Sequence, residues 1–296
     1  MILRLLSAWL LLVTGPAVWA QQFSFSLGVN TGITASHTMD KGIDRDPRYR
    51  QYYNVKFAPV GLNLGVNYEF IGFVVSPSLI NIGQNAYVIN TFDGQDGLRS
   101  LNLRYLNLPL AFKVHIINLA FLKISGIAAV SPAFLIDGSE TITHNETKLT
   151  FPTEVYPILP PGYTVEYDGV VVPAVEGLVI SEKKDFRPMQ VFAAMGVQSD
   201  WDITNNWRVI FDLRFNYGLM DPRSDDYLNR LNTYQTLYDM PGKRTDMFVQ
   251  LSVGIARYLE FEKSDQERKK KLKGTTRQYV PTNSPYRKPR SSQPRG

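Results

Sequence analysis

Acid–base chemistry in this 296-residue chain would depend on its three histidines, His37, His115 and His144. His144 lies near Ser139 and Glu146, and a histidine beside a hydroxyl can act as the general base for a nucleophile. These residue types are also ordinary constituents of a polar loop. The histidines lack a metal-binding spacing such as H-x-x-x-H, and no cysteine supplies a thiolate ligand. We therefore expect no catalytic residues, no metal and no cofactor.

A second group of charged residues is defined by its setting, because each member falls on the polar side of a stretch in which polar and apolar residues alternate. The group has four acids and four bases, which favours mutual neutralisation in a packed polar interior over an ion-selective pore. If the chain closes symmetrically between Trp201 and Trp207, Asp200 faces Arg208, where opposite charges attract. The members are Glu69, Lys113, Lys123, Asp200, Arg208, Asp212, Arg214 and Glu260.

The clearest alternating stretch is Trp207–Leu219, which reads WRVIFDLRFNYGL. Its odd-numbered positions from Val209 onward are apolar or aromatic, and Ile210 is the only apolar residue at an even-numbered position. A period of two held over this length predicts a strand with two chemically opposite faces. The apolar face requires either a core of similar strands or a membrane beside it.

Other stretches repeat this alternation and bring the expected strands to eight, an even number as in single-chain bacterial barrels. Short connections alternate with long ones, as in a barrel with short periplasmic turns and long extracellular loops. The mature chain has no run of roughly 20 apolar residues for a spanning helix, so a membrane location requires a closed barrel. A secreted β-sandwich is the soluble alternative. The expected strands are Phe23–Ile33, Val60–Phe70, Phe73–Ile82, Leu101–Val114, Phe121–Ile136, Met189–Trp201, Trp207–Leu219 and Met247–Phe261.

Residues Met1–Ala20 read as a signal peptide, with Arg4, an apolar core and a small-residue cleavage site ending at Ala20. An N-terminal membrane anchor is the alternative, although the apolar core is short. The remaining chain divides into a barrel over 21–261 and a tail over 262–296. The whole chain has a net charge of +5, but the tail alone holds 11 Lys/Arg and 3 Asp/Glu.

A family resemblance enters at Leu103–Val114, LRYLNLPLAFKV, where a Tyr-containing strand is followed by Leu-Pro-Leu and a Lys. This segment resembles the PorT-like outer-membrane β-barrel family, and Gly196–Asp221 is similar to that family's penultimate hairpin. The resemblance implies an eight-stranded barrel in a Gram-negative outer membrane, in a family whose namesake is implicated in protein secretion. The tail beyond Phe261 departs from the usual ending, which is an aromatic residue at or near the C-terminus.

The longest expected loop, residues 137–186, carries several prolines and aromatic residues together with two short apolar runs, Val170–Val175 and Leu178–Ile180. Loops of this length are usually functional or disordered. The apolar runs favour a folded extracellular cap, with the two runs paired as a hairpin, that could bind an extracellular partner.

The tail has few apolar residues, several prolines and many like charges, which predicts disorder. Eight crossings from a periplasmic N-terminus would place it in the periplasm, where nucleic acid is not expected. Its basic cluster could instead bind peptidoglycan or an acidic periplasmic protein. A solvated tail without a partner is the alternative. The cluster comprises Arg268, Lys269, Lys270, Lys271 and Lys273.

These patterns predict an all-β, eight-stranded antiparallel up-and-down transmembrane barrel in contact with outer-membrane lipid. An eight-stranded lumen is filled by side chains or holds at most one small ligand. We expect a non-catalytic binding or assembly component, linked to protein secretion or to the cell envelope. A lipid-modifying enzyme and a narrow channel remain as alternatives.

Overall fold

The computed structural model describes residues 23–68, 70–119, 121–151, 159, 161–204, 206–231 and 237–261, without the side chains at 59, 260 and 261. The expected signal peptide over 1–20 and the tail over 262–296 lie outside the described residues. Within the described part no helix is long and apolar enough to cross a membrane.

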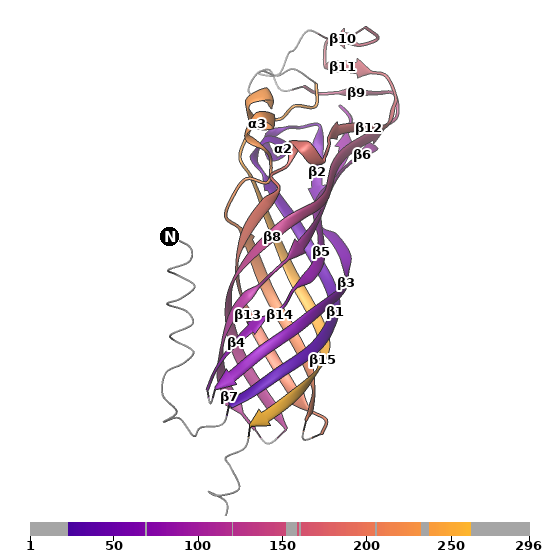
Figure 1. The fold of residues 1–296 in the computed structure, drawn as a ribbon. Coiled ribbons are helices and arrows are strands. Elements are labelled where there is room, and N and C mark those ends of the chain that lie inside the picture. Colours follow the sequence, from indigo (N-terminus) through magenta and orange to yellow (C-terminus); the bar gives the residue numbers. More distant parts are fainter. Residues whose placement is uncertain are drawn as a thin grey trace, which may run out of the picture. The chain divides into compact units, whose positions relative to one another are not determined.

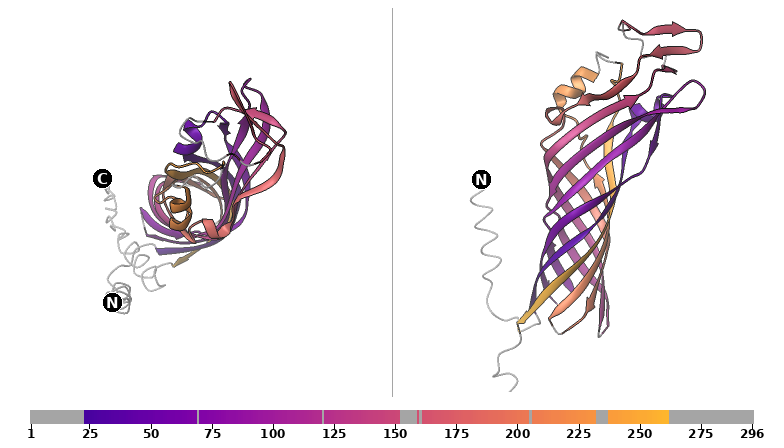
Figure 2. Two further views of the ribbon diagram at one scale, coloured as in Figure 1. Left: turned by 90° about the horizontal axis from the view of Figure 1, so that it is seen from above. Right: turned by 90° about the vertical axis from the view of Figure 1, so that its right-hand side faces the viewer.

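Antiparallel strands form a closed ring, which confirms the predicted eight-stranded barrel (Figures 1 and 2). The last strand, β15, lies beside the first, β1, and this pairing leaves the sheet without an edge along the spanning region. Two of the eight wall strands are each divided in two. The wall consists of β1 (Phe23–Asp40), β3 (Asn54–Tyr68), β4 (Ile71–Val75) with β5 (Ser78–Ile89), β6 (Gln95–Asn107) with β7 (Leu110–Asn118), β8 (Leu122–His144), β13 (Met189–Asp202), β14 (Trp207–Gly218) and β15 (Arg244–Phe261).

Prolines cause both divisions. Pro77 separates β4 from β5 and Pro109 separates β6 from β7. Proline has no backbone N–H for a strand ladder, so pairing is interrupted at each. The carbonyls remain useful acceptors, because Leu62 donates its backbone N–H to Pro77 O at 2.8 Å and Ser76 donates to Pro109 O at 3.2 Å. The expected strands Phe73–Ile82 and Leu101–Val114 are therefore interrupted rather than continuous.

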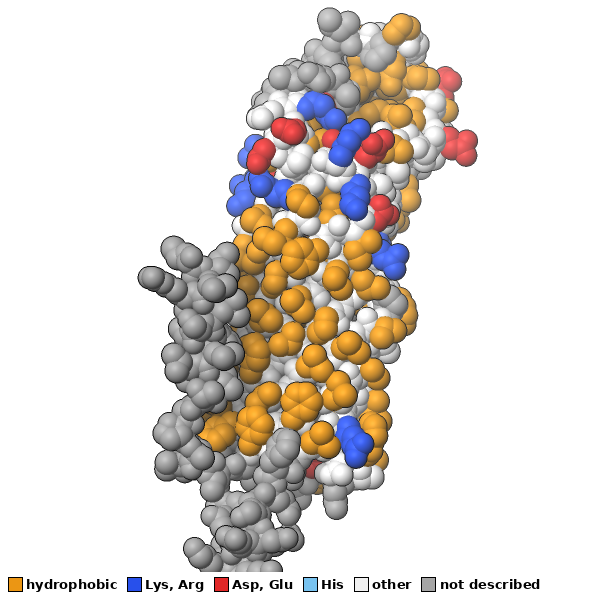
Figure 3. All heavy atoms as spheres, viewed as in Figure 1, with side chains coloured by type: hydrophobic (Ala, Val, Ile, Leu, Met, Phe, Trp, Pro, Cys, Tyr) orange, Lys and Arg blue, Asp and Glu red, His pale blue; other side chains and the backbone are white. Residues whose placement is uncertain are grey.

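The two faces of the spanning strands match the predicted alternation. On β14 the side chains of Phe211, Leu213 and Phe215 are 41–50% exposed, whereas Asp212 and Arg214 are buried. On the face drawn in Figure 3, apolar side chains form a broad band over the lower part of the barrel. Because exposed apolar side chains are stable beside lipid, this band marks the membrane-spanning region.

The wall strands continue well beyond this band, which the sequence analysis does not predict. The ladder between β1 and β3 runs on to the pair Ser36–Asn54, and β8 continues to His144. Shorter elements complete a head above the band, which we define as the described residues of 34–56, 81–104, 137–187 and 221–246. These elements are α2 (Lys41–Arg45), β2 (Tyr49–Tyr52), β9 (Thr147–Leu149), β10 (Thr164–Glu166), β11 (Gly169–Val172), β12 (Val175–Ser181), η1 (Lys183–Asp185) and α3 (Asp225–Leu231).

The expected long loop 137–186 contains folded elements, but the expected hairpin between its apolar runs is wrong. The run containing β11 pairs with β9 and β10 in a separate sheet, at the top of Figure 1. The run containing β12 pairs instead with the upper part of β8. The reason is that β8 itself extends into the head and offers a long partner edge, which a free loop would not.

Candidate functional site: the lumen and the head

The end of the lumen farther from the head holds a buried ion pair between two of the charged residues singled out from the sequence. Lys113 Nζ lies 3.0 Å from Asp200 Oδ2, and both side chains are 1% exposed. Tyr258 donates its hydroxyl to the same carboxylate oxygen at 3.3 Å. The pair reaches across the inner side of β8, because Lys113 on β7 and Asp200 on β13 lie on the two strands that pair with β8. Charges of opposite sign thus fill this level of the barrel.

Arg208 does not face Asp200 as expected. The register pairs Arg208 with Asp202, and its Nε also contacts the Asp202 carboxylate. The hairpin is therefore offset by two residues from the symmetric closure around the tryptophans, and Trp201 lies opposite Val209. Turn hydrogen bonds from Ile203 and Thr204 to Trp207 O set this offset.

The remaining lumenal residues form local pairs or fall outside the described part. Arg214 and Asp212 are two positions apart on β14 and form a buried ion pair at 2.5 Å. Lys123 is half-buried, and its register partner on β13 is Asp200. Residue Glu69, the side chain of Glu260 and the basic tail cluster lie outside the described residues.

Above these charges the lumen is closed by packed apolar side chains. This layer, which we call the apolar plug, combines residues from β5, β6, β8, β13 and β15 with Phe186. Phe192 packs edge-on against both Tyr105 and Phe248, with ring centroids 6.3 and 5.3 Å apart. The members of the plug are Ile80, Ile82, Leu101, Leu103, Tyr105, Ala133, Leu135, Phe186, Phe192 and Phe248.

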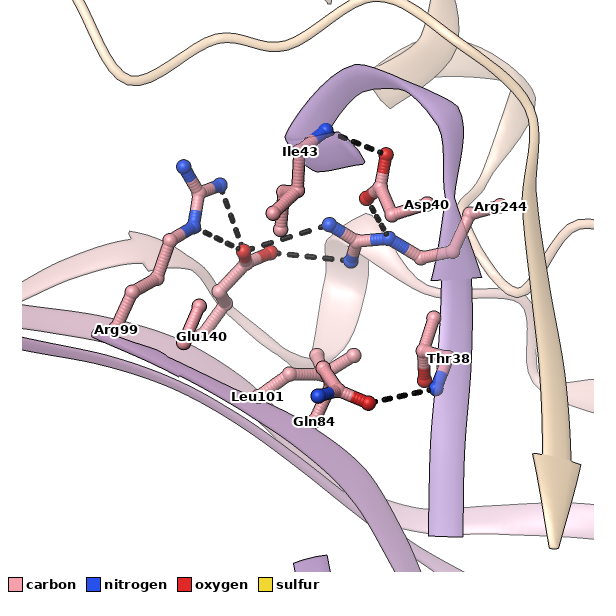
Figure 4. Close-up of a pocket in the computed structure, with 9 residues that line it drawn as sticks. Thr38, Asp40, Ile43, Gln84, Arg99, Leu101, Glu140 and Arg244 are labelled. Carbon is pink, nitrogen blue, oxygen red and sulfur yellow. Dashed lines mark hydrogen bonds and ion pairs between the residues drawn. The ribbon is translucent and has the colours of Figure 1, made fainter. Parts of the chain in front are cut away.

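A network of four charged residues lies above the plug, at the mouth of the barrel (Figure 4). Arg244 Nε lies 2.7 Å from Asp40 Oδ2, and Arg244 Nη1 lies 3.1 Å from Glu140 Oε2. Arg99 donates from Nε and from Nη2 to Glu140 Oε1, each at 2.6 Å. All four side chains are buried, and they join strands β1, β6, β8 and β15 at one point. We call this group the mouth network.

The mouth network lies outside the membrane. Glu140 is four residues beyond Ile136, the last exposed apolar residue of β8 before the head, a distance of about 13 Å along a strand. Burial alone would raise the pKa of the Glu140 carboxyl, but the charges of Arg244 and Arg99 outweigh burial and lower it to about 2. Burial alone would lower the pKa of the Arg244 guanidinium, but the charges of Glu140 and Asp40 outweigh burial and raise it. Glu140 and Arg244 are thus both ionised at neutral pH.

Two further buried arginines anchor the loops of the head. Arg48 donates from Nη2 to Asp46 Oδ2 at 2.6 Å and from Nη1 to Leu237 O at 2.8 Å. Its guanidinium also stacks over Phe151 at 4.2 Å from the ring centroid. Arg223 forms a 2.8 Å ion pair with Asp221. These contacts surround the apolar core of the head, which comprises Ile43, Tyr49, Ala86, Val88, Ile142, Leu149, Phe151, Val170, Val172, Leu237, Tyr238 and Met240.

The mouth network is not predicted from the sequence, because all four of its residues lie outside the expected strands. A usable signal exists on β6, where Arg99, Leu101, Leu103 and Tyr105 continue the period of two and are all buried. Apart from Arg99, these interior positions are apolar or aromatic, and the outward positions between them are mostly polar. This arrangement is the reverse of the one in the membrane. A strand in water shows that reversed pattern.

The loop residues considered for acid–base chemistry do not come together. Ser139 and His144 both lie on β8, on opposite faces, with Ser139 partly exposed and His144 2% exposed. Both ring nitrogens of His144 are engaged, Nδ1 with Asn145 O at 2.8 Å and Nε2 with Tyr238 Oη at 3.1 Å. His37 lies in β1 and His115 in β7. The described residues contain no group of acids and histidines suited to a metal ion.

Comparison with known proteins identifies a family. A family model described as outer membrane protein beta-barrel domain matches residues 19–222. Solved structures of similar topology include Neisserial surface protein A (8% identity, TM-score 0.34, 79% of this chain and 96% of that one). The attachment invasion locus protein of Yersinia pestis is 11% identical, with TM-score 0.31 over 81% and 99% of the two chains. The outer membrane protein OprG of Pseudomonas aeruginosa is 10% identical, with TM-score 0.31 over 82% of this chain and 97% of that one. No curated protein matches.

Proposed function

We propose, on the premise that this chain belongs to the outer membrane protein beta-barrel domain family, that it is a closed, non-catalytic binding or assembly component. Its place is the outer membrane of a Gram-negative bacterium, and its working surface is the head. The observation that carries the proposal is the mouth network above the apolar plug. Together they fill the lumen and tie four wall strands into a rigid base for the head.

The filled lumen argues against the narrow channel as the main role. The Lys113–Asp200 pair, the apolar plug and the mouth network occupy successive levels of the barrel. Because removing such layers would require breaking buried ion pairs, the closed state is stable. Planar-bilayer recordings of the purified protein should show no steady conductance. A stable pore that passes small sugars would overturn this part of the proposal.

The head has the construction of a binding platform. It has its own apolar core and a three-stranded sheet, β10-β11-β9, outside the barrel wall. Rigid, preordered surfaces lose less conformational entropy on association than mobile loops do. The resemblance of Leu103–Val114 to PorT-like barrels supports a partner in protein secretion or in the cell envelope.

The register offers a precise deletion to test the head. His144 on β8 and Val175 on β12 are Cα partners, so a short turn can replace residues 146–173 while both strands remain paired. We expect the trimmed protein to fold, remain non-conducting and lose its extracellular partner in pull-downs from native outer membranes. The full-length chain is the positive control. Recovery of the same partners by both proteins would contradict the assignment of the binding surface to this part of the head.

We propose further that residues 262–296 lie in the periplasm and bind peptidoglycan or an acidic protein there. The support is their charge, 11 Lys/Arg against 3 Asp/Glu. Binding of this kind weakens as the Debye length falls from about 10 Å at 0.1 M salt to about 3 Å at 1 M. Co-sedimentation with purified sacculi across that range, comparing the full chain with one ending at Phe261, tests the proposal. Equal sedimentation of the two would remove it.

A further inference from the structure

The upper edge of the apolar band is sharply defined on β6 and β8. Leu106, Phe134 and Ile136 are exposed apolar residues at the top of the band. Arg104 and Asp137 are the next outward positions, are both exposed, and are Cα partners in the β6–β8 ladder. This edge is the depth at which the phosphate groups of outer-leaflet lipids lie in a membrane.

The wall is built differently where β3 approaches β5 at the same depth. The two strands pair only at Gly61–Ser78, and above that point β1 side chains bond to the edge of β5. Thr34 donates Oγ1 to Asn81 O at 2.8 Å, and Ser36 donates Oγ to Gly83 O at 2.7 Å. We call this gap in the backbone ladder, between residues 54–60 of β3 and 79–84 of β5, the seam.

Two cationic side chains lie near each other at the seam. Lys56 reaches across it, and its Nζ contacts Asn102 Oδ1 on β6. Arg104 is two residues from Asn102 on the same face of β6, about 7 Å along the strand. Neither cation forms an ion pair with a residue that the structure describes. Asp137, the register partner of Arg104, is the neighbouring acidic position.

An apolar surface on β3 lies at the same level as Arg104. Asn81, the register partner of Arg104, donates Nδ2 to Phe57 O at 3.3 Å, so Phe57 lies level with Arg104. Phe57 and Val60 are 60% and 61% exposed, and Leu62 continues the surface down into the apolar band. A phosphate and an acyl chain would therefore find complementary surfaces side by side.

We propose that the seam binds a phosphorylated glycolipid of the outer leaflet, with its phosphate between Lys56 and Arg104 and an acyl chain along Phe57 and Val60. Ammonium and guanidinium groups form strong charge-assisted hydrogen bonds to phosphate. The adjoining apolar surface favours a lipid over a free phosphate ion. The seam also benefits, because a bound lipid covers the part of the wall without a backbone ladder. This binding is independent of the partner of the head.

The test uses the full-length protein in detergent and measures binding of diphosphoryl lipid A by native mass spectrometry. Each basic residue near an anionic lipid surface contributes about fivefold in binding constant, so Lys56→Gln with Arg104→Gln should weaken binding about 25-fold. Removing the neighbouring acid by Asp137→Asn should strengthen it several-fold. Arg50→Gln, which removes one positive charge at the distal part of the head, should leave binding unchanged. Heat-modified mobility on gels verifies that each variant is folded.

Two ligand controls separate the lipid from its parts. Dephosphorylated lipid A should bind as weakly to the wild type as diphosphoryl lipid A binds to the double variant. Inorganic phosphate at the same concentration should not compete. The proposal is overturned if the double variant binds diphosphoryl lipid A as tightly as Arg50→Gln does, or if inorganic phosphate displaces the lipid.

Discussion

The membrane-spanning part of the barrel and the head are built from the same strands but have opposite polarity. On β14, within the membrane, Leu213 and Phe215 face outward while Asp212 and Arg214 face the lumen. On β6 and β8, within the head, Leu101 and Ile142 face inward, while outward positions such as Arg104 are polar. The β6–β8 ladder continues across the boundary, with a register shift between Arg104 and Tyr105, while the medium beside the strands changes.

This comparison shows that the surroundings of a strand decide which face must be apolar. In lipid the outward face is apolar, and polar groups are satisfied inside by ion pairs such as Lys113–Asp200. In water the inside becomes an ordinary apolar core, and charges inside it must be paired because isolated buried charges are costly. At the level of the mouth network, the four strands that contribute its residues have entered the head.

The largest effect is expected from breaking the mouth network. Glu140→Gln removes the carboxylate that lies between Arg99 and Arg244 and leaves two buried guanidinium groups with too little negative charge. Loss of one partner of a buried ion pair costs about 3–5 kcal/mol. Urea unfolding followed by tryptophan fluorescence measures the change. Glu182→Gln, at an exposed position, is the control, and equal stability of the two variants would contradict the structural role of the network.

A matched pair of leucine substitutions tests the change of medium directly. Leu213 and Leu98 both face outward, 50% and 37% exposed, the first in the apolar band and the second in the head. Leu213→Arg should lower the free energy of unfolding by about 2–4 kcal/mol if it lies near the bilayer midplane. Leu98→Arg should change it by less than about 0.5 kcal/mol. Similar costs in lipid vesicles would show that the boundary lies elsewhere.

Acid should weaken the head through Glu140. The pKa of this carboxyl falls from 4.5 to about 2 on folding, so its stabilising contribution is complete above pH 4.5 and is lost as the pH falls toward 2. At pH 3 the loss amounts to about 2 kcal/mol. Unfolding free energies measured from pH 7 to pH 3 should show this slope in the wild type. Between pH 7 and pH 3, Glu140→Gln should lose about 2 kcal/mol less unfolding free energy than the wild type. An identical loss in the two proteins would argue against the lowered pKa.

The smallest effect is expected at the exposed ion pair of the head. Arg50 and Asp93 are 2.6 Å apart, but their side chains are 54% and 74% exposed. Solvent-exposed pairs contribute about 0–1 kcal/mol, because water and salt screen them. Arg50→Gln should therefore leave the unfolding midpoint nearly unchanged at 0.5 M salt. If Arg50→Gln lowered stability nearly as much as Glu140→Gln, solvent exposure would not explain the difference between exposed and buried ion pairs.

The predicted strand faces agree with the structure because alternation is a local property. Phe211 and Asp212 alternate in the sequence and therefore point to opposite sides of any strand that contains them. The limits of the strands are less local. The first expected strand ends at Ile33, but the β1–β3 ladder continues to Ser36, since backbone pairing persists wherever both partners are held together. Residues Asp40, Arg99, Glu140 and Arg244 fall outside the predicted strands for this reason.

The sequence by itself determined the number of spanning strands, their faces and the polar character of the lower lumen, since each follows from the pattern within one short segment. Only the tertiary structure decided which charges pair. Arg99 and Glu140 are 41 residues apart in the chain, and Arg244 and Glu140 are 104 apart. Arg208 pairs with Asp202 rather than Asp200 because the turn sets the register. Pairing depends on which strands become neighbours and at what offset, and backbone hydrogen bonds and side-chain packing over the whole ring settle both.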